Sequence, residues 1–200
     1  MKLARLLLLV LFAATALADS RTYTVAKDPK NGAHFKVVDS LEDVVGTTGD
    51  VTGTITADRA KPAAATVELS VGMTTFDTGN SMRNDHTRRY LEASKFPLAT
   101  FKSVSVNAPA TIAPNQSTDI TIAGDFTAHG VTKRLTVPVR VVLIPETTTS
   151  RATRGPGDWI HATATFAITM GDYGIHVPSN LLVTVDDKAT IVVDVFAKAQ

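Results

Sequence analysis

The fold is decided by a stretch of alternating side chains, IHATATFAI, at residues 160–168. This alternation is the period of a β-strand with one buried face. Its apolar positions are Ile160, Ala162, Ala164, Phe166 and Ile168. The same period recurs in further rows: Val67-Leu69-Val71, Ile120-Ile122, Val137-Val139-Val141-Leu143 and Ile191-Val193-Val195. The chain is therefore predicted to be mostly β-sheet.

Breaker residues divide these rows into short strands. Pairs such as Lys61-Pro62 and Pro145-Glu146 are spaced as hairpin loops are, without the long helical crossovers that parallel strands require. Gly46, Gly49 and Gly53 lie in or beside strand patterns, where glycine commonly marks a bulge or bend that curves a sheet. The sequence therefore favours an antiparallel meander that closes into a barrel.

One segment departs from the β rhythm, NSMRNDHTRRYL at residues 80–91. It is polar, Ser81 stands where an N-cap would, and Met82, His86 and Tyr90 are spaced four apart, as on one face of a helix. We predict one short helix that lies across the barrel or covers one of its ends. Phe96-Pro97 then returns the chain to a strand.

The first residues are typical of an export signal. Lys2 and Arg5 precede an apolar stretch at residues 6–12 that is too short to span a bilayer. Small residues follow at Ala16 and Ala18, as a signal peptidase requires. We predict a signal peptide at residues 1–18, one domain at residues 19–200, and no membrane anchor after cleavage.

Composition and motifs argue against several functional classes. The 20 Lys and Arg residues nearly balance the 19 Asp and Glu residues, so no nucleic-acid partner is implied. The chain has no cysteine and hence neither disulfides nor thiolate metal sites. Its five histidines form no local metal-binding pair, and the GxSxG, GxGxxG and P-loop motifs are missing from the sequence. We predict no catalytic residues, no metal and no cofactor, and thus a protein that is not an enzyme.

Two blocks of sequence resemble the YceI-like polyisoprenoid-binding proteins. The first is MRNDH at residues 82–86 with YLEASKFPLATF at residues 90–101, which is similar to the family's helix and the strand that follows it. The second is GDFTAHGVTK at residues 124–133, which is similar to the family's hairpin motif GxLTxHGVT. The blocks occur in the family's order, and the resemblance covers most of residues 19–200.

This resemblance implies a periplasmic, all-β protein: an antiparallel lipocalin-like β-barrel of about eight strands with one short helix. The barrel interior would hold an isoprenoid or other lipid-like amphiphile for transport, storage or sequestration. Because the inward rows are rich in small side chains and aromatics are 6% of residues, we expect incomplete filling. The alternative is a filled β-barrel that acts as a protein-interaction module, through a sheet edge or the polar loop at residues 147–154.

The expected ligand-binding residues combine an apolar wall with a polar mouth. Arg83, His86, Arg88 and Arg89 could meet an anionic headgroup, although the same residues fit a solvated helix face. His129 is expected to be structural, because it precedes a hairpin glycine. The expected partner is an amphiphilic small molecule. A homodimer is also considered as the assembly of the protein. The residues predicted to contact the ligand are Phe35, Phe76, Met82, Arg83, His86, Tyr90, Phe96, Phe101, Phe126 and Phe166.

Overall fold

The computed structural model of the protein describes residues 20–40, 42–177 and 185–200. The predicted signal peptide at residues 1–18 lies outside the described residues. The elements are β1 (Ser20–Val25), β2 (Gly32–Asp39), β3 (Val44–Thr48), β4 (Val51–Asp58), η1 (Pro62–Ala64), β5 (Thr66–Gly72), α1 (Ser81–Tyr90), β6 (Leu98–Asn107), β7 (Ser117–Ala128), β8 (Val131–Ile144), α2 (Thr148–Arg154), β9 (Trp159–Thr169), η2 (Met170–Tyr173) and β10 (Val185–Ala199).

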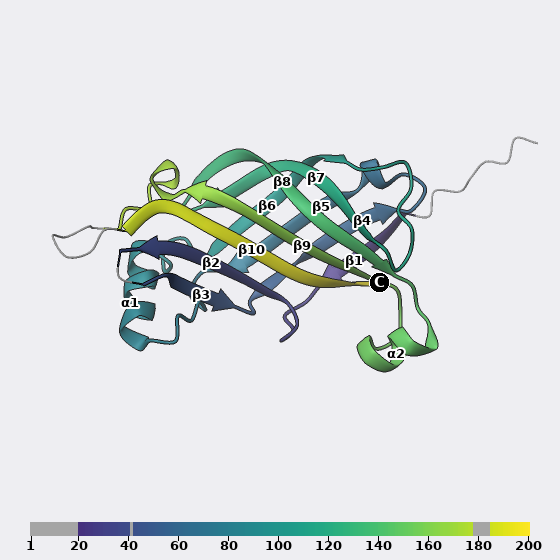
Figure 1. Ribbon diagram of the computed structural model, residues 1–200, viewed down its shortest axis with the longest axis horizontal. Coiled ribbons are helices and arrows are strands. Elements are labelled where there is room, and N and C mark those ends of the chain that lie inside the picture. Colours follow the sequence, from purple (N-terminus) through teal and green to yellow (C-terminus); the bar gives the residue numbers. More distant parts are fainter. Residues whose placement is uncertain (1–19, 41, 178–184) are drawn as a thin grey trace, which may run out of the picture.

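The strands form one closed antiparallel barrel (Figure 1), which confirms the predicted fold class. The sheet order is β1-β4-β5-β6-β7-β8-β9-β10-β2-β3, and an additional β1–β10 pairing closes it. The long strand β10 pairs with β2 through its first part and with β1 through its last residues. Strands β3 and β4 likewise pair with β2 and β1 in turn. Ten strands therefore occupy the eight positions of the barrel.

A buried polar side chain repairs the break between β1 and β2. Asn31 is 4% exposed, and its amide oxygen accepts a hydrogen bond from the Phe196 backbone N–H of β10 at 2.7 Å. Its amide nitrogen donates to the Ala26 carbonyl at 2.8 Å. Unpaired backbone groups are costly when buried, so this side chain replaces ladder bonds that the interrupted strand does not supply.

The helices lie at opposite ends of the barrel, α1 at one and α2 at the other (Figure 1). The expectation of a single helix is wrong, because Thr148–Arg154 forms a second helix where the sequence predicted a loop. A capping box starts it: the Thr147 side chain accepts from the Ser150 N–H at 3.0 Å, and the Ser150 hydroxyl accepts from the Thr147 N–H at 2.7 Å. Among the described residues, no helix is long and apolar enough to cross a membrane.

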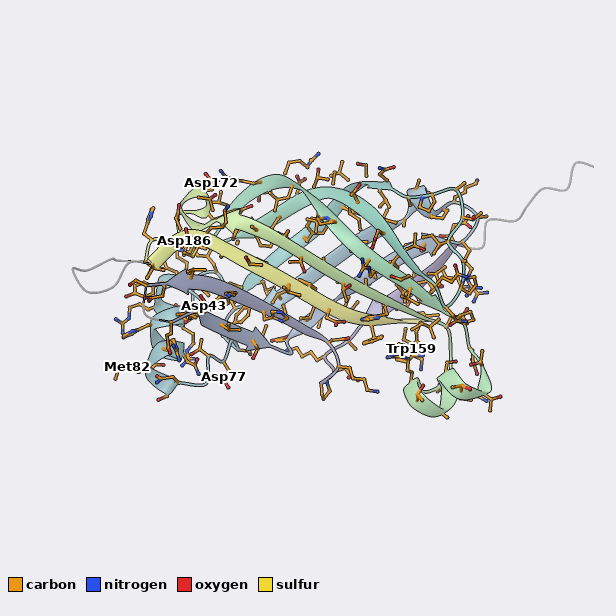
Figure 2. The ribbon with its side chains drawn as sticks, viewed as in Figure 1. Asp43, Asp77, Met82, Trp159, Asp172 and Asp186 are labelled. Atoms are coloured by element: carbon orange, nitrogen blue, oxygen red, sulfur yellow. The ribbon has the colours of Figure 1, made fainter. Side chains whose placement is uncertain are left out.

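The interior contains two clusters of buried side chains that differ in character. The packed half, toward α2, includes Tyr23, Val25, Leu143 and Ile160, all at most 7% exposed. The cavity half, toward α1, contains a second cluster around Phe126, Met170 and Tyr173, and its wall borders the space described below. Met82 and Trp159, labelled in Figure 2, mark the α1 and α2 ends.

Candidate functional site

An apolar cavity of about 410 Å³ lies in the barrel interior. It borders the cluster of the cavity half and extends to residues of the first cluster, such as Ile55, Val67 and Val195. This volume falls within the range of about 300–1,000 Å³ that is typical of small-molecule sites. Strands β2 to β10 and helix α1 all contribute to its lining, which consists mainly of aliphatic and aromatic side chains. Such a space can bury a hydrocarbon chain and offers it few hydrogen-bond partners.

The cavity exists because inward positions in this half carry small side chains. On β9 the lining includes Ala162 and Ala164, and Ala128 of β7 and Ala189 of β10 also line it. In the packed half, β8 and β9 carry the larger inward groups Leu143 and Ile160, whereas β10 carries Ala197. The alternating pattern is the same in both halves, so the particular set of facing side chains, and not the pattern, decides which half is filled.

Aromatic rings form one part of the cavity wall. Phe126 packs edge-on against Phe166 and Tyr173, with ring centroids 5.6 Å and 5.5 Å apart. Phe35 packs against Phe76 at 5.1 Å. Burial, and secondarily the neighbouring Asp172 carboxylate, raises the pKa of Tyr173. These edge-to-face contacts give the wall a fixed shape.

Gly46 makes room for one of these rings. A Cβ atom built on Gly46 would lie 2.4 Å from Phe35 Cε1, so the ring of Phe35 lies directly against the glycine on the neighbouring strand. The sequence predicted a bend of the sheet at Gly46, but this glycine instead provides space for the Phe35 ring. The strand is interrupted farther along, at residues 49–50, between β3 and β4.

Helix α1 covers the mouth of the cavity. Its cap is Asn80, whose side chain accepts from the Arg83 N–H at 3.0 Å, and not the predicted Ser81, which is the first helical residue. Arg83, His86, Thr87 and Tyr90 line the cavity from this helix. Their spacing of three and four residues places them on one helical face.

Few main-chain contacts join the mouth to the wall of the barrel. On its edge away from β2, strand β3 meets residues 73–80 through the isolated bridge Thr47–Asp77, whose two N–H···O bonds are both 2.8 Å. An ion pair between Arg83 and Glu42 adds a link from α1. By contrast, β4 and β5 are paired continuously from Val51↔Val71 to Thr56↔Thr66. The seam between β3 and α1 thus has fewer backbone hydrogen bonds than the β4–β5 pair.

Eight of the ten residues predicted to contact a ligand line the cavity. They are Phe35, Phe76, Arg83, His86, Tyr90, Phe101, Phe126 and Phe166. Met82 does not, because it lies one position off the inward face of α1 and is 68% exposed. Phe96 also lies outside the lining, since its ring packs on His129 with centroids 4.8 Å apart.

His129 has the structural position that the sequence favours. It occupies the β7–β8 turn with φ 51° before Gly130 with φ 76°, and these positive values are typical of a type I′ hairpin. Its Nδ1 lies 3.0 Å from the Tyr173 carbonyl oxygen. The imidazole therefore ties the hairpin to η2, outside the cavity lining.

Sequence reasoning did not single out several lining residues. Leu69, Val71 and Val139 belong to alternating rows, so their inward direction was available from the period, but the period does not separate cavity from core. Met73 and Met170 lie outside the strands and carry no periodic signal. Over residues 20–40, 42–177 and 185–200, no group of three His, Cys, Asp or Glu residues is placed to hold a metal ion.

Comparison with known proteins gives a family match over most of the chain. The family model of the YceI-like domain matches residues 23–197. "Protein YceI" of Escherichia coli O17:K52:H18 is 36% identical over 99 residues, which are 48% of each chain. "Protein YceI" of Salmonella newport is 30% identical over 132 residues, 64% of this chain and 65% of that protein. The first match thus spans about half the length of that curated relative.

Solved structures show the same fold at low identity. BcnA of Burkholderia cenocepacia has a TM-score of 0.67 and 18% identity, and the match covers 87% of this chain and 99% of BcnA. A polyisoprenoid binding domain from Saccharophagus degradans, implicated in plant cell wall breakdown, has a TM-score of 0.68 and 14% identity over 90% of this chain and 99% of that domain. At these identities the likeness shows the barrel fold alone.

Proposed function

Because the chain belongs to the YceI-like domain family, we propose that it is an exported binding protein that holds an isoprenoid or other fatty-chain amphiphile inside its barrel. Transport, storage or sequestration in the periplasm would each use such a site. The polyisoprenoid binding domain of Saccharophagus degradans shares the fold and supports this choice of ligand class.

The observation that carries the proposal is the apolar cavity of about 410 Å³. Each apolar Å² that a ligand chain removes from water contributes roughly 25 cal/mol before the entropy of ordering the chain is subtracted. A hydrocarbon tail therefore supplies most of the affinity. The cavity also argues against the filled barrel that served as the alternative.

Polar groups at the mouth are suited to orient a headgroup. Arg83, His86 and Tyr90 line the cavity on the side of α1. Arg83 is the arginine of α1 that lines the cavity, and its charge is paired with Glu42, so the lining offers little free positive charge to a strongly anionic headgroup. We therefore expect the mouth to select by hydrogen bonding more than by net charge.

A binding protein fits these residues better than an enzyme does. The cavity lining is mainly hydrocarbon, and its ionisable side chains all come from β2 and α1: His34, Asp39, Arg83, His86 and Tyr90. Catalysis of group transfer requires a nucleophile or an acid and base placed against the substrate. We propose that the chain binds its ligand without changing it.

Native mass spectrometry of the purified protein, followed by solvent extraction, tests the carrier function. We expect a stoichiometric adduct that is released on denaturation and identified as a prenyl or acyl lipid. The same spectrum reports whether the chain forms a homodimer. An apo mass that stays unchanged after incubation with prenyl and acyl lipids would contradict the proposal.

A matched pair of substitutions on β10 locates the bound molecule. Val193 lines the cavity and its neighbour Val192 does not, because successive strand residues point to opposite faces. Val193→Phe is expected to fill part of the cavity and remove the adduct. Val192→Phe should retain it, and equal behaviour of the two variants would place the ligand elsewhere.

A further inference from the structure

Large apolar side chains are exposed mainly at one end of the molecule. In the described part of the chain, five such side chains are between 42% and 68% exposed. One of them, Val104, lies in the middle of β6. The other four, which we call the mouth rim, are Val38, Val45, Met82 and Leu98.

All four residues of the mouth rim lie at the α1 end of the barrel. Val38 is the next-to-last residue of β2 and Val45 the second residue of β3, and these strand ends lie beside α1 (Figure 1). Leu98 is the first residue of β6. Met82 lies in the first turn of α1, the helix that covers the mouth (Figure 2). The exposed apolar groups are therefore gathered where the cavity opens.

The exposure of the mouth rim is not explained by packing or by contact with the cavity. All four residues lie outside the cavity lining. On β2 and β3 the lining includes Val37 and Val44, so the next residues, Val38 and Val45, point outward. Covering these side chains would release free energy in proportion to the apolar area removed from water.

Charged groups separate the rim residues from one another. Lys36 pairs with Val45 across β2 and β3, and its ammonium group is ion-paired with Asp43. Further ion pairs at this end join Arg83 to Glu42, Arg88 to Asp85 and Lys133 to Asp172. A stable protein interface needs a contiguous core with few charges and about 800 Å² on each partner. The surface of a bilayer, by contrast, accepts apolar side chains singly between its headgroups.

Helix α1 adds positive charge to this end. Arg89 follows Met82 by seven residues, so the two side chains share one face of the helix, and both are exposed. Within the described ranges Arg89 has no ion-pair partner. Residues 80–96 carry four cations and two acids: Arg83, Arg88, Arg89, Lys95, Asp85 and Glu92. This excess complements the phosphates of phospholipid headgroups.

We propose that the mouth rim docks the protein on the surface of a phospholipid bilayer, with Met82 inserted among the headgroups and Arg89 beside a lipid phosphate. The mouth then faces the membrane, and an apolar ligand passes between bilayer and cavity without exposing its surface to water. This surface goes beyond the proposed function. Docking can be measured whether or not the cavity is filled, so its failure would leave the carrier function standing.

Flotation with vesicles of phosphatidylethanolamine and phosphatidylglycerol tests the docking. We expect the parent protein to float with the vesicles. A parent protein that stays in the lipid-free fraction would overturn the docking surface. If that protein also dimerises in sedimentation experiments, and Met82→Ser is monomeric, the mouth rim belongs to a contact with a second copy of the chain instead.

Two matched valines locate the contact. Val38 and Val104 are 50% and 56% exposed, but Val104 lies six residues beyond Leu98, roughly 20 Å along β6. Val38→Ser should weaken vesicle binding about threefold, and Met82→Ser about fivefold, because each removes an inserted apolar group. Val104→Ser should bind as the parent does. Equal binding by Val38→Ser, Met82→Ser and Val104→Ser would overturn the location of the contact at the mouth rim.

A charge variant tests the part assigned to Arg89. Arg89→Gln should weaken binding to vesicles that contain phosphatidylglycerol about fivefold, since one cation near an anionic surface contributes about that factor. Its binding to vesicles of phosphatidylcholine alone should change by less than about twofold. If Arg89→Gln binds the anionic vesicles as the parent does, Arg89 does not contact the lipid.

Discussion

The packed half and the cavity half of this barrel share one backbone plan but differ in what fills them. The same strands, β8, β9 and β10, run through both halves with an unbroken register. Toward α2 they carry Leu143, Ile160 and Ala197 in a closed row, and toward α1 they carry Val139, Ala164 and Val193 around a space. The difference teaches that one half supplies stability, which allows the other to remain hollow.

The largest expected effect separates the two halves by stability. Leu143 is buried in the packed half, whereas Leu69 of β5 lines the cavity. Leu143→Ala should cost about 3–4 kcal/mol of unfolding free energy, because close-packed neighbours cannot collapse into the void. Leu69→Ala should cost about half as much, since its side chain already borders unfilled space. Urea denaturation of the ligand-free protein measures the unfolding free energy of both variants. Equal losses would contradict the difference in packing between the two halves.

The second effect concerns the mouth of the cavity half. Thr47 and Asp77 exchange two backbone hydrogen bonds, a geometry with Cα atoms about 5.5 Å apart that suits a disulfide. Because the chain has no cysteine, Thr47→Cys with Asp77→Cys creates a single defined crosslink. Oxidation should slow the release of a fluorescent farnesyl probe at least tenfold, and reduction should restore it.

A crosslink in the continuous wall is the control for this lock. Thr127 of β7 and Thr132 of β8 are paired, and their hydroxyl oxygens are 2.7 Å apart. Oxidised Thr127→Cys with Thr132→Cys should release the probe at the rate of its reduced form. If both crosslinks slow release equally, the seam between β3 and α1 is not the exit.

The third effect tests how the cavity wall is shaped. Gly46→Ala would place a methyl group against the ring of Phe35, which must then turn toward the cavity. We expect probe affinity to fall by about tenfold, the equivalent of losing one or two buried methylenes. Gly32→Ala is the matched control on the neighbouring strand, because its new methyl meets Thr48 O at an ordinary 3.5 Å. Equal affinities for the two variants would show that Phe35 yields without entering the cavity.

The smallest effect is a pH dependence in the cavity half. Burial raises the pKa of Tyr173, so the folded state keeps this proton to higher pH than the unfolded state does. Its contribution to stability is complete below the unfolded pKa of about 10 and is lost as the pH rises through the folded pKa. Thermal melting should therefore fall more steeply above about pH 10 in the parent protein than in Tyr173→Phe.

At neutral pH the same substitution should be nearly silent. The Tyr173 hydroxyl is buried and has no hydrogen-bond partner in the part of the chain that the structure describes. Removing an unsatisfied hydroxyl costs little and can stabilise the fold. A large loss of stability in Tyr173→Phe at neutral pH would reveal a partner for this group.

The sequence was sufficient to predict the barrel fold, but it did not predict which half of the interior is packed and which half holds the cavity. Alternation at residues 160–168 predicts a strand with an inward face, and Ile160 and Ala164 follow that pattern equally. Whether an inward side chain meets core or cavity depends on its partners across the barrel, which come from distant strands. The alternating pattern therefore located the inward wall but could not show where the cavity ends and the packed core begins.

Helix α1 is a second case in which the sequence predicted an element but not all of the side chains that face the cavity. The spacing of Met82, His86 and Tyr90 indicated a helix correctly. Of these three, His86 and Tyr90 line the cavity together with Arg83 and Thr87, whereas Met82 does not. The helix is polar on most sides and has no fully buried residue, so no apolar stripe in the sequence marked its inner face. Its orientation comes instead from Asn80, Asn84 and the Glu42 pair.

Closure of the barrel between β1 and β10 has a consequence for folding kinetics. The two strands join the most distant parts of the described chain, and Gln200 Nε2 donates to Thr24 Oγ1 at 2.7 Å across 176 positions. Such contacts give a high contact order, and proteins of this kind fold in milliseconds to seconds, since a long loop must close first. During that interval the interior is accessible along its whole length. A lipid enclosed at this stage would depart only at the slow rate set by the finished barrel, so loading and release are expected to follow different routes.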